Sequence, residues 1–363
     1  MARITPRKGL LNITPYKAGD AKIDGFDRVI KLASNESPLG PSPKAVEAIK
    51  NRTDSGLQLY PDPTCRELRQ AIGEIHGLKP EQIICSAGSE ELLHLLAKGY
   101  ATDGDEVIYC QYGFIAYPIT IYAAGATPVM VQEDNFTANV GAILAAVTPK
   151  TKIVNLANPN NPTGTYLAKS EVARLRQGLR DDILLVLDAA YAEYVAQDDY
   201  DAGFDLVDNG MENTIVTRTF SKIYGLAGLR VGWAYGPKSV LDILHRIRGT
   251  FNVGTLSQAA AIAAVRDVDH VAKAKAHNSK WMPIMSQTLE NLGMTVTASQ
   301  GNFILVHFAG GPDQATAADQ YLRSKGIIVR PVGNYDLAGA LRITLGTDCE
   351  NEALCAAMSS FFS

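Results

Sequence analysis

The amino-acid sequence predicts an α/β fold, with a large domain built on a mainly parallel seven-stranded sheet and a small α+β domain after it. Seven short apolar runs alternate with helix-like or loop segments between residues 82 and 234, a pattern typical of a parallel sheet covered by helices on both faces. At 363 residues the chain is long enough for two domains. Its content of 46% apolar and 20% charged residues is that of a folded globular protein.

The large domain is expected to contain all seven of these strands. The segment from Val107 to Gln132 has no charged residue and is long enough to cross a bilayer. Glycines and prolines interrupt it, so it fits a strand, a helix ended by Gly125 and a second strand better. The predicted strands are Gln82–Cys85, Val107–Cys110, Pro128–Val131, Lys152–Leu156, Ile183–Leu187, Thr214–Thr217 and Arg230–Ala234, with a helix through Ile119–Ala124.

The pattern changes after Gly254, where helical segments precede a new set of strands. The first 45 residues are rich in Gly, Pro and Asn, which indicates an arm and not a domain of its own. We therefore expect an N-terminal arm joining the small domain (1–45), a large α/β domain (46–270) and a small α+β domain (271–363). The later elements are predicted as helices at Ser257–Val265, Val268–Leu292, Asp313–Lys325 and Glu350–Phe361, and as strands at Phe303–His307, Ile327–Arg330 and Leu341–Thr344.

Composition narrows the classes of function. The net charge is −4, with 34 Lys+Arg against 38 Asp+Glu and no long run of one sign, which argues against binding to nucleic acid or to an anionic membrane. The five cysteines are scattered, and neither they nor the six histidines form the spacing of a disulfide framework or a metal site. The start of the chain is basic but lacks the apolar core of a secretory signal, which favours a cytoplasmic location.

The segments that follow the predicted strands carry the chemistry, because ligands of parallel α/β sheets bind outside the carboxyl ends of the strands. Small residues at 86–91 open a helix whose N–H groups could hold a phosphate, and a turn rich in Asn and Pro spans 158–164. Asp188 ends an apolar strand, where a buried acid needs a partner, and Lys222 follows another strand. Each feature alone has an ordinary explanation as a helix cap, a turn or a surface lysine.

Together, these four segments indicate pyridoxal phosphate. That cofactor needs a lysine that binds its aldehyde, a carboxylate at its pyridine nitrogen, donors to its phenolic oxygen and a cradle for its phosphate. All four features appear along the chain in order. A carboxylate about 4 Å from the ring nitrogen, at an effective dielectric constant of about 20, is worth roughly 4 kcal/mol, which keeps that nitrogen protonated and the ring an electron sink.

Several of these motifs resemble a known family. Asn161-Pro162-Thr163-Gly164, Asp188-x-x-Tyr191 and Ser221-Lys222 with Arg230 resemble the pyridoxal-phosphate-dependent transferases of fold type I. Residues 11–16, 32–40, 60–63, 326–331 and 341–344 narrow the resemblance to the histidinol-phosphate aminotransferase family, over nearly the whole chain. The pattern departs at Gln111-Tyr112-Gly113, where relatives usually carry Pro-Thr-Tyr, and at Ala189-Ala190, which lacks a second acid. The resemblance implies that domain 46–270 binds the cofactor.

The resemblance also implies roles for individual residues. Lys222 would bind the cofactor and move the proton at the substrate's α-carbon, and Asp188 would pair with the pyridine nitrogen. Tyr191 and Asn161 would hydrogen-bond the phenolic oxygen, and Tyr112 would stack on the ring. The phosphate would be held by Ala87, Gly88, Ser89, Thr219, Ser221 and Arg230, together with Tyr60 of the partner subunit. A homodimer is therefore implied.

The implied activity is a reversible, ping-pong transfer of an amino group between L-histidinol phosphate and 2-oxoglutarate, giving imidazole acetol phosphate and L-glutamate, in L-histidine biosynthesis. Arg342 would bind the substrate carboxylate, with Tyr16, Asn35 and Arg330 near the distal anion. The physics agrees, because two guanidiniums can serve carboxylates and a phosphate alike through bidentate hydrogen bonds.

Two other activities stay open at this point. Similar family members transfer the amino group of phenylalanine or tyrosine, and a decarboxylase of phosphorylated threonine shares the lysine, the Asp and the arginines. Which bond at the α-carbon breaks depends on how the pocket holds the substrate. A regulator that uses the cofactor only as a ligand would need a DNA-binding domain, for which the pattern leaves no room. A dinucleotide enzyme is disfavoured because no Gly-x-Gly-x-x-Gly follows the first strand.

Overall fold

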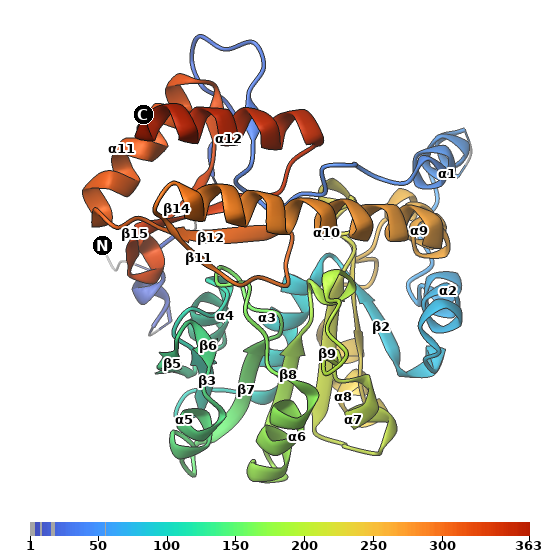
Figure 1. Cartoon of the computed structure of the whole chain (residues 1–363). Coiled ribbons are helices and arrows are strands. Elements are labelled where there is room, and N and C mark those ends of the chain that lie inside the picture. Colours follow the sequence, from blue (N-terminus) through green and yellow to red (C-terminus); the bar gives the residue numbers. More distant parts are fainter. Residues whose placement is uncertain (1–3, 8, 16–18, 55) are drawn as a thin grey trace.

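The computed structural model describes residues 4–7, 9–15, 19–54 and 56–363, and its largest element is a seven-stranded sheet (Figure 1). The strand order is β2-β10-β9-β8-β7-β3-β4. β10 is antiparallel to both of its neighbours, and the other adjacent pairs are parallel, which confirms the mainly parallel sheet. The strands are β2 (Ile83–Ser86), β3 (Glu106–Cys110), β4 (Thr127–Val131), β7 (Thr151–Ala157), β8 (Leu184–Asp188), β9 (Thr214–Thr219) and β10 (Gly232–Tyr235).

Helices cover both faces of this sheet, so its central strands can be apolar throughout. Every residue of β8 and β9 is buried. One face packs on α3 (Ser89–Tyr100), α4 (Ala116–Ala124) and α8 (Lys238–Ile247). The other face packs on α2 (Arg66–His76), α5 (Val140–Ala145), α6 (Lys169–Gly178), α7 (Phe204–Asp208) and α9 (Thr255–Arg266). The uncharged segment 107–132 forms β3, α4 and β4 as predicted, and none of the helices among the described residues is both long and apolar enough to cross a membrane.

A second, four-stranded antiparallel sheet has a hydrophobic core of its own. Its order is β11-β12-β15-β14, and α10 runs from the α9 end of the large sheet to this smaller unit (Figure 1). The elements of the unit are α10 (Val268–Asn291), β11 (Thr295–Thr297), β12 (Phe303–His307), α11 (Gly311–Ser324), β13 (Ile327–Ile328), β14 (Arg330–Val332), β15 (Leu337–Thr344) and α12 (Asp348–Phe362). The boundaries at residues 45 and 270 stay a proposal.

The N-terminal arm pairs with this second unit. β1 (Ile30–Lys31) lies parallel to β13, and α1 (Pro43–Thr53) packs on α9. The strand predicted at 327–330 is therefore divided, because β13 pairs with the arm while β14 pairs with β15. The remaining short elements are β5 (Glu133–Asp134), β6 (Thr137–Ala138) and the 3₁₀ turns η1 (Leu10–Asn12), η2 (Pro80–Gln82), η3 (Ala192–Tyr194), η4 (Ala227–Leu229) and η5 (Gly333–Tyr335).

Candidate functional site

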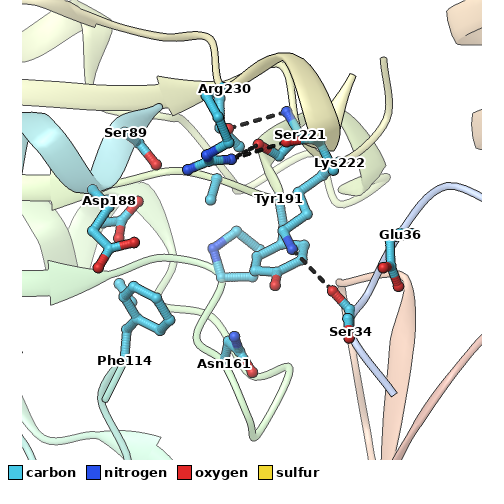
Figure 2. A pocket seen from close by; sticks show the side chains of 16 residues that line it. Ser34, Glu36, Ser89, Phe114, Asn161, Asp188, Tyr191, Ser221, Lys222 and Arg230 are labelled. Atoms are coloured by element: carbon cyan, nitrogen blue, oxygen red, sulfur yellow. Dashed lines mark hydrogen bonds between the residues drawn. The ribbon is translucent and has the colours of Figure 1, made fainter. Parts of the chain in front are cut away.

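A cavity of about 240 Å³ opens where the central strands of the large sheet end. Residues that follow β7, β8 and β9 line it, as the strand-end argument predicts. Figure 2 shows Asp188 and Phe114 on one side of this cavity and Lys222 on the other, with Tyr191 between them. The predicted residues that line it are Ser89, Asn161, Asp188, Tyr191, Thr219, Ser221, Lys222 and Arg230.

Asp188 supplies a buried carboxylate to this cavity. Its two oxygens accept hydrogen bonds from the Tyr117 hydroxyl and the Thr217 hydroxyl, each at 3.2 Å. Burial raises the pKa of Asp188 to about 6, although these two hydrogen bonds oppose the rise. A bound cation would favour the charged form, so the carboxylate is suited to pair with a protonated ring nitrogen.

Lys222 supplies an amine. Its Nζ lies 3.4 Å from the carbonyl oxygen of Ser34, to which it donates, and 5.5 Å from the centre of the Tyr191 ring. Burial lowers the pKa of Lys222 to about 8, and the nearby charge of Arg342 acts in the same direction. A substantial fraction of the amine is therefore neutral near physiological pH, as nucleophilic attack or proton abstraction requires.

An anion cradle lies beside the first turn of α3. Gly88 has a φ of +83°, a conformation that favours glycine, and a Cβ there would lie 2.4 Å from Nη2 of Arg230, so a larger residue would displace this guanidinium. Arg230 itself adopts a left-handed conformation outside β10, and its Nη1 donates to Oγ of Ser221 at 3.2 Å. The guanidinium and the positive end of the α3 dipole thus face the same space, which suits a phosphate.

Ala87, which is predicted to hold the phosphate, has a backbone hydrogen bond to a side chain of α3. Its N–H donates to Oε2 of Glu91 at 2.6 Å, and the same oxygen accepts from Asn252 Nδ2 at 2.7 Å. That N–H therefore already has a hydrogen-bond partner, the Glu91 side chain of α3. Ser89, Thr219, Ser221 and Arg230 line the cavity beside Gly88, and Glu91 accepts the Ala87 N–H.

A second cavity of about 180 Å³ adjoins the first and shares Ser34, Phe114, Asn161 and Lys222 with it. The predicted substrate residues Asn35, Arg330 and Arg342 line this second cavity. The two cavities therefore place two guanidiniums next to the Lys222 amine.

Side chains of the two cavities also bond to each other. Asn35 Nδ2 donates to the Tyr191 hydroxyl at 3.0 Å, while Arg342 donates to Oδ1 of Asn161 at 2.6 Å and to the carbonyl of Ala33 at 2.7 Å. A ligand on Arg342 would therefore share a hydrogen-bond network with the residues beside Lys222.

Among the described residues, Tyr112 and Tyr60 lie away from both cavities, and neither Ala87 nor Gly88 lines them. The ring of Tyr112 packs on Phe136 at 5.6 Å between centroids, and Phe114, two positions on, lines both cavities. Tyr60 is 81% exposed and stacks on Phe251 at 4.3 Å, outside both cavities. Tyr16 lies outside the described residues.

Sequence reasoning missed several residues of the site. Phe114 could have been found from the departure at 111–113, since the expected aromatic position there is a glycine. Thr217 precedes Thr219 by two residues in β9 and so points to the same face. No local signal marks the others, which come from the arm and from helix or turn positions: Ser34, Glu36, Tyr117, Asn334 and Tyr335.

The site fits the cofactor that the sequence indicates. A buried amine, a buried carboxylate and an anion cradle surround one cavity, and the Phe114 and Tyr191 rings line it. Among the residues that the structure describes, no group of three or more His, Cys, Asp or Glu side chains is placed to hold a metal ion. The arrangement can bind an aldehyde, a ring cation and a phosphate together.

Comparisons with known proteins agree with this chemistry. The profile of the family described as "Aminotransferase class I and II" matches residues 27–358. A histidinol-phosphate aminotransferase of Paramagnetospirillum magneticum is 53% identical over 363 residues, covering 99% of each chain. One of Rhodopseudomonas palustris (strain TIE-1) is 50% identical over 353 residues, covering 97% of this chain and 96% of the relative. The structure of histidinol-phosphate aminotransferase from Sinorhizobium meliloti in complex with pyridoxal-5′-phosphate has a TM-score of 0.91 at 28% identity, covering 99% of this chain and 98% of that one.

Proposed function

The chain belongs to the aminotransferase class I and II family, and from this premise we propose that it transfers the amino group of L-histidinol phosphate to 2-oxoglutarate, reversibly and by a ping-pong mechanism. It is a transaminase that depends on pyridoxal phosphate. The observation that carries the choice of substrate is the 53% identity over 363 residues to a histidinol-phosphate aminotransferase, and the second cavity, where Arg330 and Arg342 adjoin Lys222, offers cations for the phosphate. This activity belongs to L-histidine biosynthesis, and we propose a cytoplasmic location for the enzyme.

The cofactor supplies an electron sink that withdraws the electron pair of the bond broken at the substrate's α-carbon. In our proposal Asp188 holds its ring nitrogen, and Tyr191 and Asn161 hold its phenolic oxygen. Phe114 takes the stacking role that the sequence analysis gave to Tyr112, because Phe114 lines the cavity. The phosphate is assigned to Gly88, Ser89, Thr219, Ser221 and Arg230.

Lys222 moves the proton. Lys222 lines both cavities, so it adjoins the cofactor side and the substrate side of the site. A pKa of about 8 lets the amine accept a proton from the α-carbon and return it without a large free-energy cost in either direction. Ser34, by accepting from Nζ, orients the amine between transfers.

In this proposal Arg342 binds the α-carboxylate of glutamate, a group that histidinol phosphate lacks, and Arg330 binds the distal anion, which is the phosphate of histidinol phosphate or the side-chain carboxylate of glutamate. A guanidinium can hold a carboxylate through two parallel hydrogen bonds, which sets the plane of the substrate as well as its position. Because Arg342 also donates to Asn161, carboxylate binding and the donor to the phenolic oxygen are coupled in one network. An α-carboxylate, the distal carboxylate of glutamate and a phosphate all suit this pair of cations.

The enzyme is proposed to work as a homodimer, with Tyr60 of the partner subunit completing the phosphate site. Tyr60 and Leu59 are 81% and 66% exposed. Leu57, two residues before Leu59, and Phe251, which stacks on Tyr60, are also exposed. A cluster of exposed apolar side chains of this kind is typical of a surface that is covered by another protein chain.

A half-reaction on the purified protein tests the function. The cofactor absorbance is followed after histidinol phosphate, phenylalanine or phosphothreonine is added separately. Rapid conversion with histidinol phosphate, much faster than with phenylalanine, is the expected result. A preference for phenylalanine would instead assign the enzyme to the aromatic class, and release of carbon dioxide from phosphothreonine would make it a decarboxylase.

A further inference from the structure

The turn between β3 and α4 carries Phe114, whose ring lines both cavities. Its backbone is held by side chains from three distant segments. The N–H of Tyr112 donates to Oε1 of Glu133 at 3.0 Å, and the carbonyl of Tyr112 accepts from Asn160 Nδ2 at 3.1 Å. The N–H of Ile115 donates to the hydroxyl of Tyr335 at 3.3 Å. The ring of Phe114 is therefore placed by contacts outside its own turn.

Glu133 is an unusual residue for this position. Its side chain comes from β5, and the hydrogen bond to Tyr112 is the one its carboxylate makes among the described residues, since Oε2 is buried without a hydrogen-bond partner. Burial raises the pKa of Glu133 to about 7, with the Tyr112 N–H opposing the rise. The charge of this carboxylate acts on the Cys110 thiol and the Tyr112 phenol and raises the pKa of both. Neither group carries a positive charge that could offset the cost of burying the carboxylate. A buried carboxylate with one of its oxygens unpaired lowers the stability of the fold. Its presence here therefore indicates that the hydrogen bond to Tyr112 has a role.

We propose that Glu133 is a positioning residue of the active site, which fixes the turn at residues 111–115, and with it the ring of Phe114, by accepting the Tyr112 N–H. Reach and acceptor geometry are what matter in this role, not the negative charge. The inference rests on the proposed function in one respect, that the first cavity binds pyridoxal phosphate. Glu133 touches neither cavity, so it acts through the turn alone.

The test compares two substitutions that separate reach from charge. Glu133→Gln keeps the length of the side chain and an acceptor oxygen, whereas Glu133→Asp keeps the charge and is shorter by one methylene. Gln132→Leu changes the exposed neighbouring residue and serves as the matched control. Hydrogen exchange of the Tyr112 amide is measured in the cofactor-free protein, with peptides spanning residues 111–118. The visible circular dichroism of bound pyridoxal phosphate and its Kd are measured in parallel.

We expect Glu133→Asp to raise exchange of the Tyr112 amide and the Kd for pyridoxal phosphate about tenfold each, the effect of losing roughly one hydrogen bond. The circular dichroism band should weaken, while Glu133→Gln and Gln132→Leu stay like wild type. Wild-type behaviour of Glu133→Asp, or a loss with Glu133→Gln that Glu133→Asp does not share, would overturn the proposal. If wild-type protein binds the cofactor but fails to convert histidinol phosphate, the proposed function fails while these measurements still decide the role of Glu133.

Discussion

Replacing Asp188 by asparagine should stabilise the protein without cofactor while it removes most of the activity. The carboxylate is buried, and burial raises its pKa from an ordinary value of 3.8 to about 6. Between these two values the folded protein binds the proton more tightly than the unfolded chain does, so the free energy of unfolding falls as pH rises through this range. Above pH 6 the carboxylate is charged in both the folded and the unfolded state, and the free energy of unfolding is lower by the full amount, about 3 kcal/mol.

Asparagine has no charge to bury and can still accept from Tyr117 or Thr217, which donate to Asp188 in the wild type. Urea unfolding of the cofactor-free protein at several pH values measures the effect. The variant should be more stable by up to about 3 kcal/mol at pH 8, with a gain that shrinks below pH 6 and disappears below about pH 4. Asp198→Asn, at an exposed position, is the matched control and should show no such gain.

With the cofactor bound, the wild-type carboxylate should be favourable and its replacement by asparagine harmful. A carboxylate near a protonated ring nitrogen is worth roughly 4 kcal/mol at an effective dielectric constant of about 20, so Asp188→Asn should lower turnover by on the order of a hundredfold or more. Equal stability of the two cofactor-free proteins at pH 8, or a gain that does not change with pH, would refute the burial argument. Unchanged turnover would refute the pairing.

Four further predictions concern the rest of the site. Lys222→Ala should remove nearly all turnover and change the absorbance of the bound cofactor, as steady-state assays and visible spectra would show; a variant with normal turnover contradicts the mechanism. Phe114→Leu should weaken cofactor binding, measured by fluorescence titration, more than Tyr112→Leu does, because only the first of these rings lines the cavity; the reverse order would restore the stacking role to Tyr112. Arg330→Ala should lower kcat/KM for histidinol phosphate more than for glutamate, and equal losses would remove its role at the distal phosphate. Tyr60→Phe should raise the Kd for pyridoxal phosphate only a few-fold, by about the value of one hydrogen bond, and sedimentation that shows a fully active monomer would exclude its role in the partner's site.

Much of the cofactor site could be predicted from the sequence for a simple reason. Parallel strands end at the same edge of their sheet, so polar residues that follow separate apolar runs must meet there. Asp188, Asn161 and Lys222 are far apart along the chain and line one cavity, as this argument requires. Glycine at position 88 could also be predicted, because a phosphate cradle needs the backbone to approach closely.

Other parts of the site follow from contacts that no local pattern encodes. Ser34 reaches Lys222 because β1 pairs with β13 of the second unit, which places the arm residues that follow β1 beside the site. The strand predicted at 327–330 is divided by the same pairing, which leaves Arg330 at the start of β14, on the wall of the second cavity.

The sequence by itself therefore determined the α/β fold, the mainly parallel sheet, the family and the cofactor, since these depend on periodicity and on short motifs at strand ends. Only the tertiary structure decided which side chains of each turn face the cavity. Phe114 lines it and Tyr112 does not, because the turn is held by backbone N–H groups that donate to Glu133 and Tyr335 and by a carbonyl that accepts from Asn160. The partners of a turn's backbone N–H and C=O groups come from distant parts of the chain, and their choice fixes the direction of every side chain in that turn.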